Sequence, residues 1–156
     1  MNLEKELLER IVASVLEDSA FVFAMPMDEA PPELASWNAV GVRLKFQGHF
    51  SGYCELWAPF EVAKILSSNM LGMDDDCPDA QEMCFDALKE SLNIICGNML
   101  TEVAGEEPVF NLGTPTTLSR PEPLTEEGTS AETWFDADEH PILFRVHVDL
   151  SADAAA

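Results

Sequence analysis

The sequence predicts an α+β fold in which a largely antiparallel sheet carries long helices on one face. Segments with helical and strand periodicity follow one another as helix, three strands, helix, and then helix, three strands, which suggests two related halves without obvious sequence repetition. Short connections join the strands more often than helical crossovers do, as is typical of antiparallel pairing. With 156 residues, 47% of them hydrophobic, the chain can bury a sizeable core. We therefore expect one domain over residues 1–156, with 151–156 as a frayed tail.

The first part of the chain predicts a helix followed by two strands. Apolar residues recur at helical spacing from Leu3 to Asp18, which indicates an amphipathic helix. The short apolar run from Phe21 to Met25 suits a strand, and the proline-rich and acidic stretch from Met27 to Ser36 is typical of a loop. The alternation from Val40 to Phe46 then predicts a half-buried strand.

A hairpin and a second helix follow. Gly48 and Gly52 bracket the hairpin connection, and the return strand runs from Gly52 to about Trp57. Pro59 stands where a first helical turn accepts proline, and Gly72 stands where that helix should close. The acidic segment from Met73 to Asp79 links this part to the rest.

The second part of the chain predicts a long helix and further strands. Asp79 and Glu82 resemble a capping box at the start of a helix that extends to Ala104, and Gly105 occupies its C-terminal cap. After the helix we expect an interrupted strand, a polar loop and a final antiparallel pair, in this order: Pro108–Leu118, broken near Pro115; Arg120–Ser130; Thr133–Phe135; and Ile142–Leu150.

The long helix also carries the best candidate site. Asp86, Glu90, Asn93 and Gly97 fall within about 60° of one another around the helix axis and form one polar stripe. Apolar residues gather on roughly the opposite side, where they can enter a core: Cys84, Leu88, Leu92, Ile95 and Met99. A merely solvated face normally carries strong helix formers, whereas asparagine and glycine cost helical stability. The stripe is therefore predicted to serve a function other than helix formation.

Composition and charge exclude several function classes. The 29 acidic and 8 basic residues give a formal net charge of -21, which disfavours binding to nucleic acid or anionic membranes and favours locally basic partners. The apolar runs are far shorter than a membrane span, and the charged start MNLEKELLER does not resemble a signal peptide. We expect a soluble cytoplasmic protein that binds neither nucleic acid nor membrane.

The cysteines and histidines show no pattern of metal ligands or catalytic groups. The four cysteines lack C-x-x-C spacing and are interpreted as reduced core thiols, with Cys77 the most exposed among them: Cys54, Cys77, Cys84 and Cys96. The three histidines are widely spaced and predict no metal site: His49, His140 and His147. No arrangement typical of a nucleophilic triad is present.

The stripe resembles the signature of a known family. The pattern Asp86-x3-Glu90-x2-Asn93, followed by Pro115, is similar to that of the CheC, CheX and FliY phosphatases of bacterial chemotaxis. The likeness covers most of Gly41 to Pro115. It includes the hairpin glycines, the run Glu-Leu-Trp-Ala-Pro that leads into the second helix, and the run Glu-Ser-Leu-Asn-Ile-Ile-Cys-Gly-Asn. Pro115 comes about one residue early for the family. The first helix has no second Glu-x-x-Asn, which favours a CheX-like protein with one site per chain.

This resemblance implies hydrolysis of the aspartyl phosphate of a CheY-like receiver domain, and it assigns a role to each stripe residue. Asn93 would position the attacking water, and Glu90 would pair with the active-site lysine of the receiver. The remaining candidate positions would contact or shape the interface: Asp86 at the receiver's rim, Lys89 as partial compensation of the acidic charge, Gly97 as a point of close backbone approach, and Pro115 through its strand. The chain would need no cofactor of its own, because the receiver supplies Mg²⁺. The likeness also suggests a homodimer that pairs through sheet edges.

Three alternatives remain beside this hypothesis. The stripe could be an ordinary solvated helix face, which acidic residues at this period most often form. The chain could be a non-catalytic module with the CheX fold that docks on a receiver or a flagellar switch protein, because likeness of fold does not establish catalysis. A small-ligand sensor finds no support, since the sequence holds neither a glycine-rich phosphate loop nor a cluster of basic residues.

Overall fold

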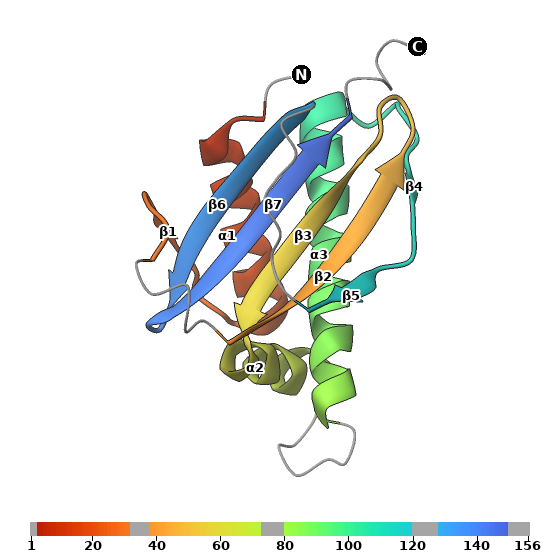
Figure 1. Ribbon diagram of the computed structural model, residues 1–156. Helices are drawn as coiled ribbons and strands as arrows, with labels where there is room; N and C mark the ends of the chain where they lie inside the picture. Colours follow the sequence, from red (N-terminus) through yellow and green to blue (C-terminus); the bar gives the residue numbers. More distant parts are fainter. Residues whose placement is uncertain (1–2, 32–37, 73–79, 120–127, 150–156) are drawn as a thin grey trace.

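The computed structural model describes residues 3–31, 38–72, 80–119 and 128–149, which form a seven-stranded sheet and three helices (Figure 1). The helices are α1 (Lys5–Ala20), α2 (Phe60–Leu71) and α3 (Ala80–Ala104). The strands are β1 (Met25–Met27), β2 (Ala39–Gln47), β3 (Gly52–Pro59), β4 (Asn111–Leu112), β5 (Thr116–Leu118), β6 (Thr129–Ala137) and β7 (His140–Val148). Every strand pair within these ranges is antiparallel, so the predicted α+β fold is confirmed.

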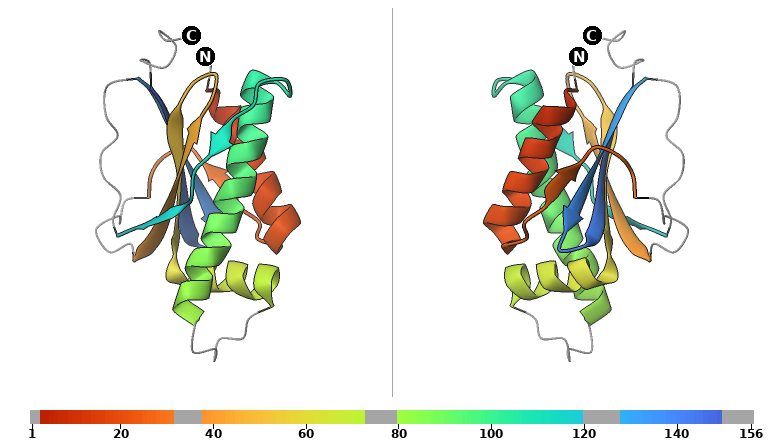
Figure 2. Two further views of the ribbon diagram at one scale, coloured as in Figure 1. Left: turned by 90° about the vertical axis from the view of Figure 1, so that its right-hand side faces the viewer. Right: turned by 90° about the vertical axis from the view of Figure 1, so that its left-hand side faces the viewer.

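The helices pack against only one face of the sheet. The strand order is β1-β6-β7-β3-β2-β4, and β5 pairs with another stretch of β2 on the same side as β4. Figure 2 shows α1 and α3 side by side against one face, with α2 across one end of the sheet. We call the face toward α1 and α3 the inner face and the opposite one the outer face. The main core lies between the inner face and the helices and contains Leu44, Phe46, Leu56, Phe135, Phe144, Leu88, Leu92 and Ile95.

A smaller apolar cluster lies on the outer face. It contains Trp57, Trp134 and Leu143, which stand next to one another in register on β3, β6 and β7. Gly41 pairs with Trp57 from β2, and a Cβ at Gly41 would lie 2.4 Å from ring atoms of that indole. A glycine is therefore required beside the indole. Trp57 is fully buried in this second cluster.

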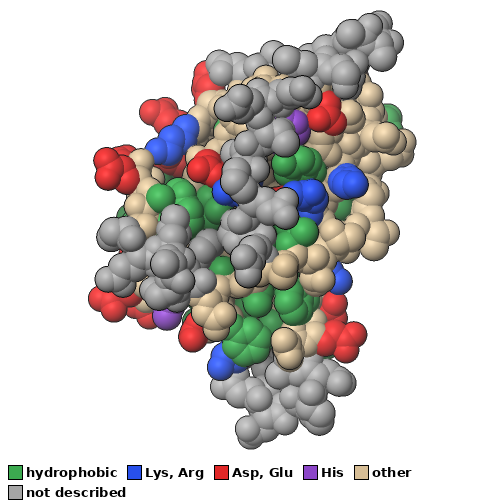
Figure 3. All heavy atoms as spheres, viewed as in Figure 1, with side chains coloured by type: hydrophobic (Ala, Val, Ile, Leu, Met, Phe, Trp, Pro, Cys, Tyr) green, Lys and Arg blue, Asp and Glu red, His purple; other side chains and the backbone are tan. Residues whose placement is uncertain are grey.

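Next to this cluster, a row of alternating charges crosses four strands of the outer face. Arg43, Glu55, Arg145 and Glu132 follow one another in register on β2, β3, β7 and β6. Glu55 is only 2% exposed, and it accepts hydrogen bonds from Arg43 Nε at 2.8 Å and from the Trp57 indole N–H at 2.9 Å. Arg145 donates to Glu132 at 2.9 Å and lies 3.8 Å from Glu55. The buried carboxylate is thus compensated from two neighbouring strands. Figure 3 shows basic and hydrophobic side chains side by side on this face.

The first part of the chain follows the prediction except after α1. The predicted strand from Phe21 to Met25 is wrong, because Phe21 ends α1 in a left-handed conformation with φ of 55° and donates its N–H to Glu17 O. The chain becomes a strand only at Met25 and continues through Met27, which the sequence assigned to a loop. Pro59 ends β3 and caps α2 instead of lying in its first turn. Gly72 closes α2 as predicted, donating its N–H to Ser68 O.

The second part differs in the number of strands. The predicted interrupted strand is two short ones, β4 and β5, and both pair with β2 on either side of the break at Pro115. β6 begins at Thr129, inside the segment predicted as a polar loop. Gly105 caps α3 with φ of 85° and donates to Thr101 O at 2.8 Å, as predicted. The proposed cap Asp79, the thiol of Cys77 and the tail 151–156 lie outside the described residues.

Candidate functional site

Helix α3 presents the predicted polar stripe to solvent. Asp86, Glu90 and Asn93 are exposed, and Gly97 is half-exposed. On the other side of the helix all five residues predicted to be apolar anchors are buried: Cys84, Leu88, Leu92, Ile95 and Met99. One face of α3 is therefore fixed in the core, and the other carries the candidate site outward.

Contacts with the two other helices hold α3 in place. The buried Ser91 hydroxyl donates to Ala87 O at 2.9 Å and lies 3.4 Å from the sulfur of Met70 on α2. Near the other end of α3, Glu102 lies 3.9 Å from Arg10 on α1. These contacts and the buried face make α3 a rigid support for short side chains.

The two central residues of the stripe are not engaged within the described part of the chain. Neither the Glu90 carboxylate nor the Asn93 side-chain amide makes a hydrogen bond or an ion pair to another described residue. They lie three residues apart, about 4.5 Å along the axis and about 60° around it. The Asn93 amide can donate and accept hydrogen bonds at the same time, while the Glu90 carboxylate can accept them from a cation. Both groups are available to a molecule that docks on α3.

No described part of the chain explains the glycine at position 97. It lies in the interior of α3, and a Cβ built on it meets no atom within 4 Å. Glycine in the middle of a helix costs about 0.8–1.0 kcal/mol relative to alanine. No contact within the described residues therefore calls for a glycine at this position.

Lys89 and Pro115 complete the set of predicted positions. Lys89 is half-exposed on α3, one helical turn before Asn93 and on its flank. Pro115 is half-buried between β4 and β5, in the segment that Figure 2 shows running beside α3. The structure therefore brings Lys89 together with the stripe on one helix, while Pro115 comes from a separate neighbouring segment.

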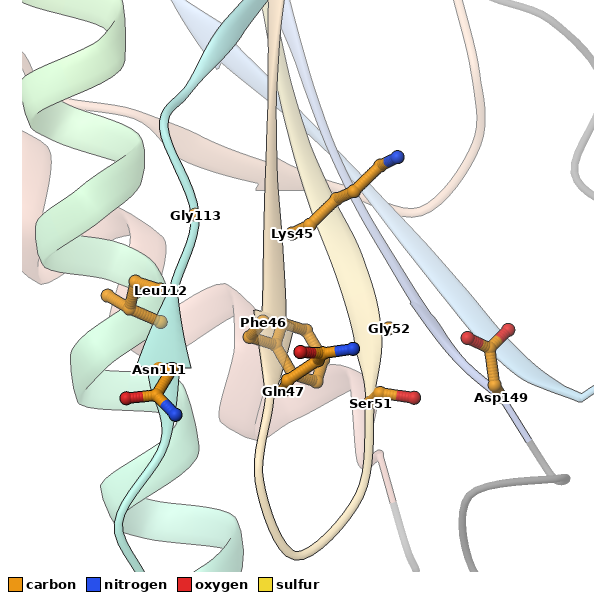
Figure 4. Close-up of a pocket in the computed structure, with 9 residues that line it drawn as sticks. All are labelled: Lys45, Phe46, Gln47, Ser51, Gly52, Asn111, Leu112, Gly113 and Asp149. Atoms are coloured by element: carbon orange, nitrogen blue, oxygen red, sulfur yellow. The ribbon is translucent and has the colours of Figure 1, made fainter.

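A shallow pocket of about 420 Å³ lies elsewhere, around the β2–β3 hairpin and β4. Its polar lining includes Lys45, Gln47, Asn111 and Asp149, and no stripe residue takes part. Figure 4 shows the side-chain ends of Lys45, Asn111 and Asp149 pointing in different directions. Because these polar groups do not converge, the pocket does not favour a specific small-molecule site.

The described cysteines are buried thiols, as predicted. Cys54, Cys84 and Cys96 are free and at most 1% exposed. Burial, reinforced by a hydrogen bond with Cys96, raises the pKa of the Cys54 thiol well above its ordinary value. Such a thiol is protonated at neutral pH and is a poor nucleophile. Within the described ranges, no group of three or more His, Cys, Asp or Glu side chains is arranged to hold a metal ion.

The family model of the chemotaxis phosphatase CheX matches residues 40–137, which is well over half of the chain and includes α3. The chain belongs to the CheX family of chemotaxis phosphatases. This CheX-family protein therefore carries its exposed Glu90 and Asn93 in the matched region.

Solved structures of CheX proteins share the fold of this family member. Similarity is found to CheX from Borrelia burgdorferi, in a complex with CheY, BeF₃ and Mg²⁺, at a TM-score of 0.71 and 21% identity, covering 92% of this chain and 96% of the other. CheX from Desulfovibrio desulfuricans gives 0.71 and 18%, covering 92% and 97%. CheX from Vibrio vulnificus gives 0.69 and 18%, covering 93% and 95%. At these identities the likeness establishes the fold alone.

No curated protein matches the sequence of this CheX-family chain significantly. Within the described residues, no helix combines the length and the apolar character that crossing a membrane would require.

Proposed function

We propose that this CheX-family protein hydrolyses the aspartyl phosphate of a CheY-like receiver domain. The observation that carries the proposal is the placement of Glu90 and Asn93: both are exposed, unengaged and one turn apart on a helix whose opposite face is buried. The complex of Borrelia burgdorferi CheX with CheY supports the choice of partner. The family described by the matching model supports the reaction.

In the proposed reaction Asn93 enters the receiver pocket and holds a water molecule in line with the phosphorus atom. An amide suits this task because one end can accept a hydrogen bond from the water while the other end donates one to the phosphoryl group. The water oxygen bonds to phosphorus, and the bond between phosphorus and the aspartyl oxygen breaks. The products are the receiver's carboxylate and inorganic phosphate, which takes up the protons of the water.

Glu90 acts as an orienting clamp in this proposal. It lies one turn before Asn93, and its carboxylate would pair with the active-site lysine of the receiver. Asp86, a further turn back, would contact the rim of the receiver, and Pro115 would shape the adjoining segment. Mg²⁺, bound by the receiver, would supply neutralisation of the phosphoryl charge. No residue of this chain is assigned to hold it.

Substitution of Asn93 tests the proposal. The full chain is incubated with a panel of CheY-like receivers charged by acetyl phosphate, and the loss of phosphate is timed. We expect the wild type to accelerate the loss for at least one receiver and Asn93→Ala to lose about 10²- to 10³-fold of that acceleration. Because the side chain is exposed and unengaged, the melting temperature should not fall. Asn98→Ala, an exposed asparagine on a different face of α3, is the matched control.

Glu90→Ala tests the clamp. It should raise the half-saturating concentration of phosphorylated receiver more than it lowers the maximal rate. If the wild type binds a charged receiver without accelerating its dephosphorylation, the chain is a docking module of the CheX fold and the catalytic proposal is wrong. If Asn93→Ala keeps the full rate, the role given to the amide is wrong.

We also propose a homodimer that pairs through the edge strand β1. Within the described residues β1 pairs only with β6. The chain leading into it exposes Phe21 (72%) and Phe23 (64%), and β1 itself exposes Met25 (65%). Exposed apolar side chains beside an open sheet edge favour strand pairing with a second copy. Light scattering should give twice the mass of the chain for the wild type and the monomer mass for Phe23→Glu. A monomeric wild type at micromolar concentration would contradict this.

A further inference from the structure

Most of the described basic side chains of this acidic protein contact a carboxylate or an aromatic ring of the same chain. Seven of the eight basic residues lie in the described ranges, since only Arg120 falls outside them. Five of the seven face a carboxylate or an aromatic ring: Lys5 with Glu9 at 3.8 Å, Arg10 with Glu102 at 3.9 Å, Arg43 with Glu55, Arg145 with Glu132 at 2.9 Å, and Lys64 over the Phe60 ring at 5.3 Å. Two ammonium groups, those of Lys45 and Lys89, have no such partner among the described residues.

These two lysines lie on opposite sides of the molecule. Lys45 projects from the outer face of the sheet, because its neighbours Leu44 and Phe46 enter the core on the inner face. Lys89 is the only basic residue of α3, and it lies four residues before Asn93. Residues at this spacing are neighbours on a helix surface, with Cβ atoms about 5–6 Å apart.

We propose that the Lys89 ammonium binds the phosphoryl group on which Asn93 acts, and thereby makes docking depend on phosphorylation of the partner. This inference rests on the proposed function. The rest of the stripe is acidic through Asp86 and Glu90, and the chain as a whole carries a charge of -21. Such a face repels a phosphoryl dianion unless a cation meets it.

The form of the lysine side chain suits this role. Its flexible stem ends in three donors, and the residue is half-exposed, so the ammonium is available at the surface. Asn93 and Lys89 would approach the phosphoryl group from neighbouring turns, the amide at the water and the ammonium at an equatorial oxygen. An unphosphorylated partner lacks that oxygen, so the ammonium discriminates between the two forms of the receiver.

The test compares Lys89→Gln with Lys45→Gln, a matched exposed lysine outside the proposed site. The partner is a receiver whose dephosphorylation the wild type accelerates. Calorimetry measures the affinity of each variant for this receiver, first without BeF₃⁻ and then loaded with BeF₃⁻ and Mg²⁺, which imitate the phosphoryl group. These two forms are called the uncharged and the charged receiver. We expect Lys89→Gln to lose about tenfold in affinity for the charged receiver, as for a lost charge-assisted hydrogen bond, and less than twofold for the uncharged one. Lys45→Gln should change neither affinity, and Lys89→Arg should restore most of the loss.

Each other outcome has a defined meaning. If Lys89→Gln weakens binding to both forms equally, or to neither, the phosphoryl contact is wrong even when the wild type is an active phosphatase. If the wild type neither binds a charged receiver nor accelerates its dephosphorylation, the proposed function itself is wrong and the inference falls with it. Equal circular dichroism spectra of the three variants exclude unfolding as the cause of any loss.

Discussion

The glycine at position 97 gives the sharpest test of the idea that α3 was shaped by an external partner. Replacing it by alanine adds one methyl group inside a helix, where the Cβ would meet no described atom within 4 Å beyond its own helical turn. The substitution therefore brings the full propensity gain, about 0.8–1.0 kcal/mol, with no steric cost within the fold. For a domain of about this size, 1 kcal/mol raises the melting temperature by about 2–4 °C.

The same methyl group should damage docking. If the main chain of the receiver approaches Gly97 closely, the added group must be forced into a packed contact, which costs about 1–3 kcal/mol. This corresponds to about a 5- to 150-fold loss in kcat/KM for receiver dephosphorylation. One substitution is thus expected to make the protein more stable and less active at the same time.

The assay pairs calorimetric melting with timed loss of phosphate from a charged receiver. Asn98→Ala is the control, because Asn98 is the exposed neighbour of Gly97 and lies about 100° away around the helix. It should raise stability slightly and leave kcat/KM unchanged. A Gly97→Ala variant that melts lower than the wild type would refute the claim that the fold does not need this glycine. A more stable variant with full activity would refute the close approach.

Two further predictions concern the outer face and the core. Glu55→Ala should lower the free energy of unfolding by about 3 kcal/mol in urea titrations, because it leaves Arg43 and Arg145 without their buried carboxylate. Glu132→Ala, at a side chain 41% exposed, should lower it by less than about 1 kcal/mol. Equal losses in the two variants would contradict the importance given to the buried carboxylate. Because burial raises the pKa of Cys54 above its ordinary 9.0, folding favours its protonated form, so this contribution to stability is complete below pH 9 and is lost as the pH rises through the folded pKa. Urea midpoints measured from pH 8 to 11 should fall, and they should fall less steeply in Cys54→Ala; parallel curves would refute the assignment.

The helices could be predicted well because their signals are local. The spacing of apolar residues in α1 and α3 and the cap glycines Gly72 and Gly105 depend on a few neighbouring residues, and all of them appear where the sequence places them. The polar stripe was predictable for the same reason, since a helix fixes which side chains share a face. The exposure of Asn93 and the burial of Leu92 both follow from the helical repeat of about 3.6 residues per turn.

The errors lie where the outcome depends on partners distant in sequence. The run from Phe21 to Met25 has strand-like composition, but Phe21 is needed as the left-handed end of α1, so pairing with β6 begins only at Met25. Glu55 lies in a strand that the sequence predicts correctly. Its burial depends on Arg43 and Arg145, whose register with β3 no local pattern reveals. Strand propensity was therefore a poorer guide than helical period.

The charged residues of the outer face are largely paired with one another, whereas those of α3 are mostly exposed and acidic. The arginines Arg43 and Arg145 are bound to Glu55 on the outer face, so they add little to the field that an approaching partner meets there. The remaining described acidic residues are mostly exposed, and on α3 only Lys89 opposes them. Such a surface would repel an anionic partner at long range, and added salt should then speed the encounter by screening the repulsion. Recognition must then come from short-range contacts, which is consistent with a site built from one amide, one carboxylate, one ammonium and the space beside a glycine.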